Sequence, residues 1–197
     1  RTLIPQAPQM LESVKLVNEQ FVVVYNRDAH HEIWRFGLDG TRLGEIPLPT
    51  LGSLNTNFEY VVSGSRPDQE LFYGFTSFLF PLSIYRYDFT TDASACLFAP
   101  PLAFDTAGYE TRQVFVTSQD GTQIPLFLTH KQGLQLDGQN PTLLYGYGGF
   151  SYSLMPSFAI SRLAWLELGG VYAQAVLRGG AEYGEEWHQA GMLDNKQ

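Results

Sequence analysis

Residues 142–150, with the sequence TLLYGYGGF, join a short apolar run to a glycine-rich loop, and they decide the fold of the second half of this chain. The run 142–145 has the length and composition of a buried strand. Glycines at 146, 148 and 149 permit positive φ angles and a close backbone approach directly after it. The apolar stretch 158–168 then predicts a helix that ends at Gly169-Gly170. A strand, a loop and a helix in this order predict a βαβ unit, with the loop at the edge where open α/β sheets bind ligands.

The neighbouring segments extend this unit into a larger sheet. Residues 171–177 predict a second strand, and Arg178-Gly179-Gly180 leads from it into a last helix near residues 184–190. Upstream, residues 113–116 and 124–128 flank the turn signal Asp120-Gly121 and predict a hairpin. Nearly continuous apolar strands indicate a parallel sheet with helices on both faces. A hairpin followed by parallel βαβ units is how an α/β-hydrolase domain begins.

The first half of the chain predicts antiparallel β-structure. Short aromatic and β-branched runs at residues 21–25, 32–36 and 71–73 alternate with turn clusters, and the pattern changes at the stiff dipeptide Pro100-Pro101. The chain also repeats itself: residues 20–26 match residues 70–76, a spacing of about 50 residues that is typical of β-propeller blades. The repeat covers few positions, so another antiparallel sheet stays open on periodicity alone.

Composition and charge exclude several classes of protein. The chain has 197 residues, of which 44% are hydrophobic and 14% aromatic, which favours a folded protein over a disordered one. Its formal net charge is −8 without a basic cluster, so we expect neither a nucleic-acid partner nor a membrane partner. Cys96 is the only cysteine, which excludes an intrachain disulfide and a cysteine-based zinc site.

The two ends of the chain predict a piece of a longer protein. It begins with Arg1 without the layout of a signal peptide, and it stops at Gln197 just after an expected helix. No apolar run reaches the roughly 20 residues that a membrane helix needs. We therefore expect both ends to be cuts.

Tyr147, within the glycine loop, is the candidate for catalytic chemistry. In α/β-hydrolases a loop after an early strand supplies one oxyanion-hole donor, and a tyrosine hydroxyl stays protonated at neutral pH and can donate there. The loop by itself favours a glycine-rich turn with two buried aromatic residues over a catalytic site. Phosphate binding is disfavoured, because the spacing is not G-x-G-x-x-G and no Gly-Lys-Ser/Thr follows.

Three other groups of polar residues suggest sites but have simpler interpretations. Glu185-x-x-His188 is half of a di-iron motif, and the rest of that motif is missing from the sequence. His30-His31-Glu32 lies between two expected strands, where a polar turn is the ordinary interpretation. Arg178, directly after a strand, is expected to form a structural ion pair.

Several motifs taken together resemble the prolyl oligopeptidase family. They occur in order and at family spacing over roughly residues 18–197, with alanine at 181 where that family often has a third glycine. They are FTSF at 75–78, SQDGTQIP at 118–125, PTLLYGYGGF at 141–150, PSF at 156–158, SRL at 161–163, RGGAEYG at 178–184, Trp187-His188 and Asn195-Lys196-Gln197.

The resemblance implies a mixed fold in two parts. Residues 1–100 would be the last blades of a seven-bladed β-propeller, and residues 101–197 the first part of an α/β-hydrolase domain that stops before the nucleophile. The whole protein would be a cytoplasmic, monomeric serine endopeptidase that cleaves short peptides after proline, without a cofactor or metal. Tyr147 would be an oxyanion-hole donor, and Phe150 would line the pocket for the proline ring.

The catalytic serine is not recognisable in these residues. No G-x-S-x-G elbow occurs, and hydrolases of this fold order their triad Ser, Asp, His, so we expect all three beyond Gln197 and no activity from this chain alone. Two alternatives stay open. One is a peptidase resembling oligopeptidase B, which cleaves after basic residues, and the other is a non-catalytic propeller scaffold.

Overall fold

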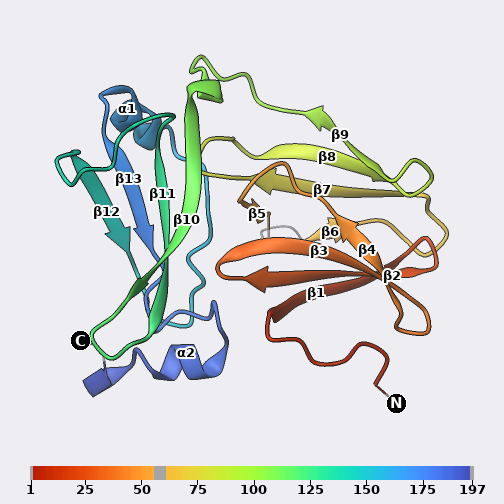
Figure 1. Ribbon diagram of the computed structural model, residues 1–197. Coiled ribbons are helices and arrows are strands. Elements are labelled where there is room, and N and C mark those ends of the chain that lie inside the picture. The colour runs from red at the N-terminus through yellow and green to blue at the C-terminus, as the bar shows by residue number, and fades with distance from the viewer. Residues whose placement is uncertain (1, 56–60, 196–197) are drawn as a thin grey trace.

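The computed structural model describes residues 2–55 and 61–195, which form two β-rich parts that lie side by side (Figure 1). Arg1 lies outside the described residues, as do Lys196 and Gln197, which belong to the last of the family motifs. The first part consists of two antiparallel sheets, and the second is a mixed sheet with two short α-helices. None of the described helices has the length and apolar character needed to cross a membrane.

The first sheet is a simple meander. Its strands follow one another in the order β1 (Met10–Val17), β2 (Gln20–Arg27), β3 (His30–Gly37) and β4 (Arg42–Ile46). Two-residue turns join β1 to β2 and β2 to β3. In the second of these turns both central residues, Asp28 and Ala29, have positive φ angles of 50° and 64°, as a tight hairpin turn requires.

The second sheet repeats the first. Its strands are β5 (Ser53–Leu54), β6 (Val62–Ser63), β7 (Glu70–Thr76), β8 (Ser83–Asp88) and β9 (Ala93–Phe98), with the order β5-β7-β8-β9 and β6 also paired to β7. Strand β7 corresponds to β2, and β8 corresponds to β3. The repeat found in the sequence therefore relates equivalent strands of the two sheets.

The main core of the first part lies between these two sheets. Val22, Val24 and Ile33 of the first sheet pack against Tyr73 and Phe75 of the second. The residues of β2 that match Tyr73 and Phe75 in the repeat lie instead in a separate cluster on the far side of the first sheet. Each sheet thus presents the same face in the same direction, as neighbouring propeller blades do, and the propeller prediction is confirmed.

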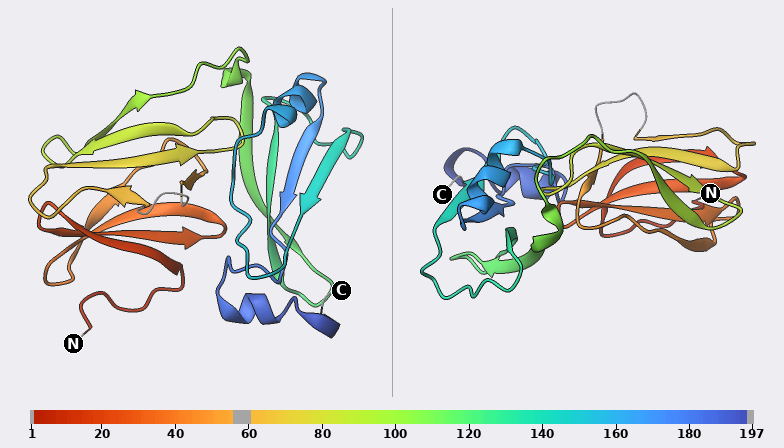
Figure 2. Two further views of the ribbon diagram at one scale, coloured as in Figure 1. Left: turned by 180° about the vertical axis from the view of Figure 1, so that it is seen from behind. Right: turned by 90° about the horizontal axis from the view of Figure 1, so that it is seen from above.

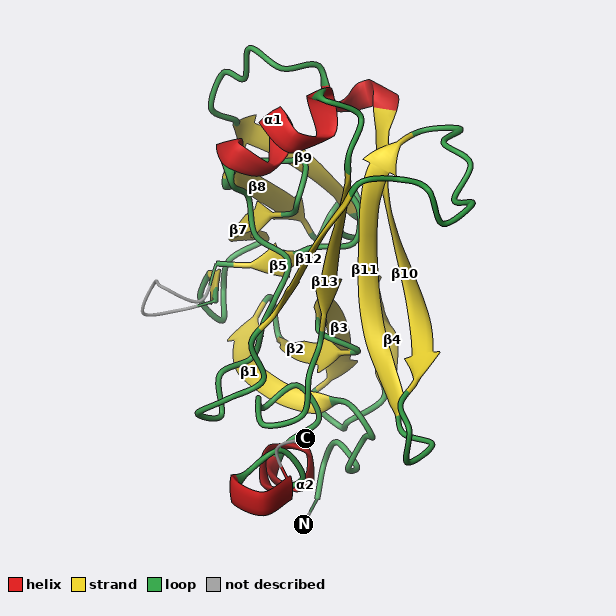
Figure 3. Ribbon diagram, turned by 90° about the vertical axis from the view of Figure 1, so that its left-hand side faces the viewer, coloured by secondary structure: helices red, strands yellow, loops and turns green. Residues whose placement is uncertain are grey.

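The third sheet belongs to the second part and has the order β10-β11-β13-β12 (Figure 3). The antiparallel hairpin β10 (Tyr109–Thr117) and β11 (Gln123–Lys131) has β13 (Val171–Ala175) beside it, also antiparallel, and β12 (Thr142–Gly146) runs parallel to β13. A short 3-10 helix (Thr106–Gly108) precedes β10. The predicted hairpin and βαβ unit are both present, so the mixed fold is confirmed.

The helices differ from the prediction in their extent and in their positions relative to the sheet. Helix α1 (Ile160–Glu167) is shorter than the expected 158–168, and α2 (Glu185–Gln189) is followed by a 3-10 helix (Leu193–Asn195). Helix α1 packs on β11 and β13, whereas α2 lies beyond the end of the strands (Figure 1). The prediction of helices on both faces is therefore wrong for the described residues, and Leu144 on β12 is 67% exposed.

Candidate functional site

The two parts share a hydrophobic interface. Ala29 from the β2–β3 turn, with Phe78 and Leu79 from the loop after β7, packs into the same cluster as Phe127 and Tyr172 of the third sheet. Figure 2 shows the two parts meeting along this edge from two further directions. Next to this turn the Tyr183 hydroxyl donates to Asp28 Oδ1 at 2.6 Å. The β2–β3 turn of the first part therefore packs in the hydrophobic core of the second part.

A cavity of about 720 Å³ lies between the two parts. Its lining includes Glu12, His31 and Ser53 from the propeller sheets and residues 151–158, which connect β12 to α1. The Ser53 hydroxyl donates to the Pro156 carbonyl at 2.7 Å, which ties this connection to the propeller. Residues 151–158 therefore line the cavity and contact the propeller, and they connect β12 to α1.

The predicted site loop, residues 146–150, lies at the carboxyl end of the parallel strands. Gly146 pairs with Ala175 at the end of β12 and β13, and the two loops that follow these strands contact each other. The Ser151 amide donates to the Gly179 carbonyl at 3.1 Å. The predicted loop therefore stands at the edge of the sheet where a ligand-binding loop is expected.

Glycine is required at the point where these two loops touch. Gly148 has a φ of +57°, and a Cβ there would lie 2.5 Å from Leu177 Cβ and 2.7 Å from the Arg178 carbonyl oxygen. A Cβ at Gly179 would lie 2.4 Å from the Gly148 carbonyl oxygen. The close backbone packing explains why the sequence carries glycines in both loops.

Tyr147 and Phe150 come from the same loop but have different surroundings. Tyr147 is 45% exposed, and its ring packs edge-on against Tyr152 with 6.0 Å between the ring centroids. Phe150 is 90% exposed and has a φ of +55°, an unusual angle for a residue with a bulky side chain. Backbone strain of this kind occurs at functional sites, where the surrounding structure maintains it.

Arg178 forms the structural ion pair that the sequence predicts. Its guanidinium contacts the carboxylate of Asp120 in the β10–β11 turn. The hydroxyl of Ser118, the amide of Thr122 and the guanidinium of Arg178 lower the pKa of Asp120 well below its usual range. Arg178 thereby holds the hairpin turn against the loop after β13.

The two histidine-containing motifs have structural partners. In α2 Glu185 accepts a hydrogen bond from Gln189, and His188 Nδ1 lies 2.7 Å from the Gly179 carbonyl oxygen. The prediction of a turn at 30–32 is wrong, because these residues begin β3 and the turn lies at 28–29. His31 is buried, and its Nδ1 accepts the Leu54 amide at 2.7 Å, which joins the two blades.

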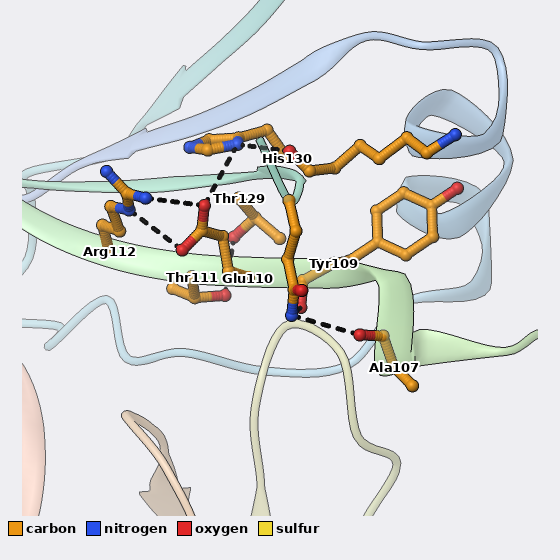
Figure 4. Close-up of polar contacts among 9 residues, drawn as sticks. Ala107, Tyr109, Glu110, Thr111, Arg112, Thr129 and His130 are labelled. Atoms are coloured by element: carbon orange, nitrogen blue, oxygen red, sulfur yellow. Dashed lines mark hydrogen bonds and ion pairs between the residues drawn. The ribbon is translucent and has the colours of Figure 1, made fainter. Parts of the chain in front are cut away.

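His130 is also buried but lies away from the site loop. Its Nδ1 is 2.9 Å from the Lys131 carbonyl oxygen and 4.0 Å from Glu110, which in turn pairs with Arg112 (Figure 4). Because β11 is antiparallel to β13, the end of β11 lies at the amino end of the parallel strands. Tyr147 therefore lies at the carboxyl end of the parallel strands, and His130 lies at their amino end.

Glu182 is a buried acid that the sequence interpretation overlooked. Glu182 lies within the sequence RGGAEYG, which contributes to the sequence interpretation only as a family motif. The residue is buried, with 1% of its surface exposed. Its Oε1 accepts the Leu154 amide at 2.7 Å. Burial raises the pKa of Glu182, and the Leu154 amide, the Glu182 amide and the Trp187 side chain oppose the rise. No pattern in the sequence distinguishes this acid from the exposed Glu185 and Glu186.

The raised pKa of Glu182 gives a testable dependence of stability on pH. The folded protein binds the proton of Glu182 more tightly than the unfolded chain, so the contribution of Glu182 to the free energy of unfolding should fall as pH rises from about 4.5 through the folded pKa. A tenfold difference in proton affinity between the two states corresponds to a fall of about 1.4 kcal/mol. Relative to wild type, Glu182→Gln should remove this contribution and the exposed control Glu186→Gln should retain it, as measured by denaturant unfolding between about pH 4 and 8. Equal pH dependence in both variants would contradict the assignment.

Stacked propeller blades joined to the first strands of a hydrolase sheet define a class, the propeller-capped α/β-hydrolases. Two family models match the chain: the N-terminal β-propeller domain of prolyl oligopeptidase over residues 1–100, and the prolyl oligopeptidase family over residues 156–197. This chain belongs to the prolyl oligopeptidase family.

Individual relatives agree with this assignment. The chain is 39% identical over 176 residues to the prolyl endopeptidase of Elizabethkingia meningoseptica, covering 89% of this chain and 24% of that protein. It is 40% identical over 205 residues to a prolyl oligopeptidase of Omphalotus olearius, covering 100% of this chain and 26% of that protein.

Solved structures agree as well. A prolyl endopeptidase structure matches 99% of this chain and 28% of its own length, with a TM-score of 0.84 and 38% identity. Prolyl oligopeptidase B from Galerina marginata matches 100% of this chain and 28% of its own length, with a TM-score of 0.86 and 32% identity. The chain thus spans about a quarter of the length of the relatives that it matches.

Proposed function

We propose that this chain is the propeller-to-hydrolase section of a serine endopeptidase that hydrolyses oligopeptides on the carboxyl side of proline. The observation that carries the proposal is the site loop: in a chain of this family, Tyr147 follows a parallel strand at the carboxyl edge, with its ring partly exposed. In this proposal residues 1–100 are the last blades of a seven-bladed propeller. Residues 101–197 begin the catalytic domain, and the serine, aspartate and histidine lie outside them.

Tyr147 has the role of an oxyanion-hole donor in this reaction. When a serine attacks the carbonyl after proline, the carbonyl oxygen becomes negatively charged, and a phenol hydroxyl fixed beside it stabilises that charge. A phenol suits this role because it remains a hydrogen-bond donor at neutral pH. The contact between the Gly148 and Gly179 loops holds the backbone on which this side chain depends.

Phe150 has the role of a wall for the proline ring. An exposed aromatic ring in the same loop as the oxyanion donor offers a flat apolar surface, which suits a rigid apolar ring. Its exposure leaves the ring available for contact with a substrate or with other parts of a complete catalytic domain. A cytoplasmic location and a monomeric state belong to the same proposal, and the single cysteine supports the location.

The proposal predicts a preference for proline in the complete gene product. We expect the value of kcat/KM for a fluorogenic peptide with proline before the cleaved bond to exceed that for a matched arginine peptide by at least about 100-fold, since an apolar pocket must desolvate the charged side chain. The arginine peptide tests the alternative of cleavage after basic residues.

A fluorophosphonate probe separates the remaining alternatives. We expect the probe to label the complete protein and not residues 1–197 alone. Labelling of the 197-residue chain would show that it contains an activated serine. A complete protein that neither reacts with the probe nor cleaves either peptide would support the scaffold and overturn the proposal.

A further inference from the structure

Glu182 is a buried carboxylate to which the proposed reaction gives no role. The residue is 1% exposed, and Oε1 has the Leu154 amide as its partner, whereas Oε2 has no hydrogen-bond partner among the described residues. A Cβ placed at Gly180 would lie 2.2 Å from Oε2, so this oxygen packs directly against the Gly180 backbone. Burying a carboxylate with one oxygen unpaired is costly, and a neutral side chain would fill the same space at lower cost.

The hydrogen bond from the Leu154 amide to Glu182 attaches the connection between the site loop and α1 to the loop after β13. Shortly before Leu154, Tyr152 packs its ring edge-on against Tyr147. Just before Tyr152, the Ser151 amide donates to the Gly179 carbonyl. The connection is therefore attached to the loop after β13 at two points, Gly179 and Glu182, and the ring that contacts Tyr147 lies between them.

The Tyr152 ring is one support for the Tyr147 side chain. Tyr147 is 45% exposed, and the Tyr152 ring lies edge-on against it with 6.0 Å between the ring centroids. A side chain that donates a hydrogen bond in the transition state must be held close to its productive position, and an error of about 1 Å can reduce a rate by about 100-fold. The Tyr152 ring, whose backbone lies between the two attachment points, supplies such a restraint on one side.

We propose that Glu182 is a positioning residue: by accepting the Leu154 amide it fixes the connection at Tyr152 and so orients Tyr147 for oxyanion stabilisation. The proposal rests on the oxyanion role proposed above for Tyr147. It assigns Glu182 an effect on the turnover step and none on the binding of the substrate. A purely structural hydrogen bond would instead change stability and leave kcat as it was.

The test uses the complete enzyme with two substitutions at 182 and one control. Glu182→Met keeps the volume and removes the acceptor, and Glu182→Gln keeps an oxygen for the Leu154 amide. We expect Glu182→Met to lower kcat by about 10- to 100-fold with KM within about threefold. We expect Glu182→Gln to restore kcat to within about threefold of wild type. Glu186→Met, at an exposed glutamate in α2, is the control and should behave as wild type. Titration with a fluorophosphonate gives kcat per competent site and so corrects for unfolded protein.

A double variant shows whether Glu182 acts through Tyr147. We expect Tyr147→Phe combined with Glu182→Met to lose no more activity than Tyr147→Phe alone, because both changes remove the same contribution. Additive losses, an effect confined to KM, a Glu182→Gln variant as impaired as Glu182→Met, or an unchanged kcat in Glu182→Met would each overturn the proposal. If Tyr147→Phe alone leaves kcat unchanged, it is the oxyanion role that fails, so the two failures are distinguishable.

Discussion

Replacing Tyr147 by phenylalanine in the complete enzyme should lower kcat by about 10²- to 10³-fold, which corresponds to about 2.7–4 kcal/mol of lost transition-state stabilisation. The substitution removes the hydroxyl and keeps the ring, which packs against Tyr152. Because the hydroxyl would bind the oxygen only after it becomes charged, KM should change little. Steady-state kinetics with a peptide that has proline before the cleaved bond measure both parameters.

Tyr152→Phe is the matched control for this substitution. It removes a hydroxyl from the neighbouring ring, which is 62% exposed, and keeps the edge-on contact. We expect kcat to stay within about threefold of wild type, since a hydroxyl that does not contact the oxyanion adds nothing to its stabilisation. Equal losses in the two variants, or no loss in Tyr147→Phe, would contradict the oxyanion assignment.

Gly148→Ala should reduce activity by a comparable amount for a different reason. The new methyl group would meet Leu177 Cβ at 2.5 Å and the Arg178 carbonyl oxygen at 2.7 Å, so one of the two loops must move. The positive φ adds about 1–2 kcal/mol of strain for a residue with a side chain. A displacement of about 1 Å at the Tyr147 backbone predicts a loss of about 100-fold in kcat, together with a lower midpoint of thermal unfolding.

The adjacent glycine offers a sharp comparison. Apart from its chain neighbours, a Cβ at Gly149 would meet among the described residues only Tyr147 Cε1, at 4.0 Å, which is an ordinary contact distance. We expect Gly149→Ala to lower kcat by less than about fivefold, because it adds the same methyl group without displacing a loop. Similar losses at positions 148 and 149 would show that flexibility of the loop matters more than the contact with Leu177 and Arg178.

The sequence predicted the fold where local patterns were strong. The repeat that relates residues 20–26 to 70–76 identified equivalent strands, because each blade must present the same apolar face to its neighbour. The hairpin at Asp120-Gly121 and the strand before Gly146 were also predicted, since turn residues and apolar runs determine them locally. The turn expected at 30–32 was wrong because Asp28 and Ala29 adopt positive φ without glycine and complete the turn, so that His30 already begins β3.

The candidate site was predictable in part. Tyr147 was found because glycines surround it directly after a strand, and its catalytic role, like that of Phe150, stays a prediction. Glu182 was missed because its burial depends on the connection at Leu154, which lies 28 residues away in the chain. Contacts of this kind follow from tertiary packing, and a single sequence contains no local signal for them.

The buried turn at Asp28 and Ala29 affects how this protein can be recombined with its relatives. Ala29 is 0% exposed in a cluster with Phe127 and Tyr172, although the chain passes Pro100-Pro101 between them. A chimera could join the propeller of one family member to the hydrolase domain of another at that dipeptide. Its β2–β3 turn would then come from one protein and the third sheet against which the turn packs from the other. The exchangeable unit therefore includes the turn and the hydrolase residues that receive it.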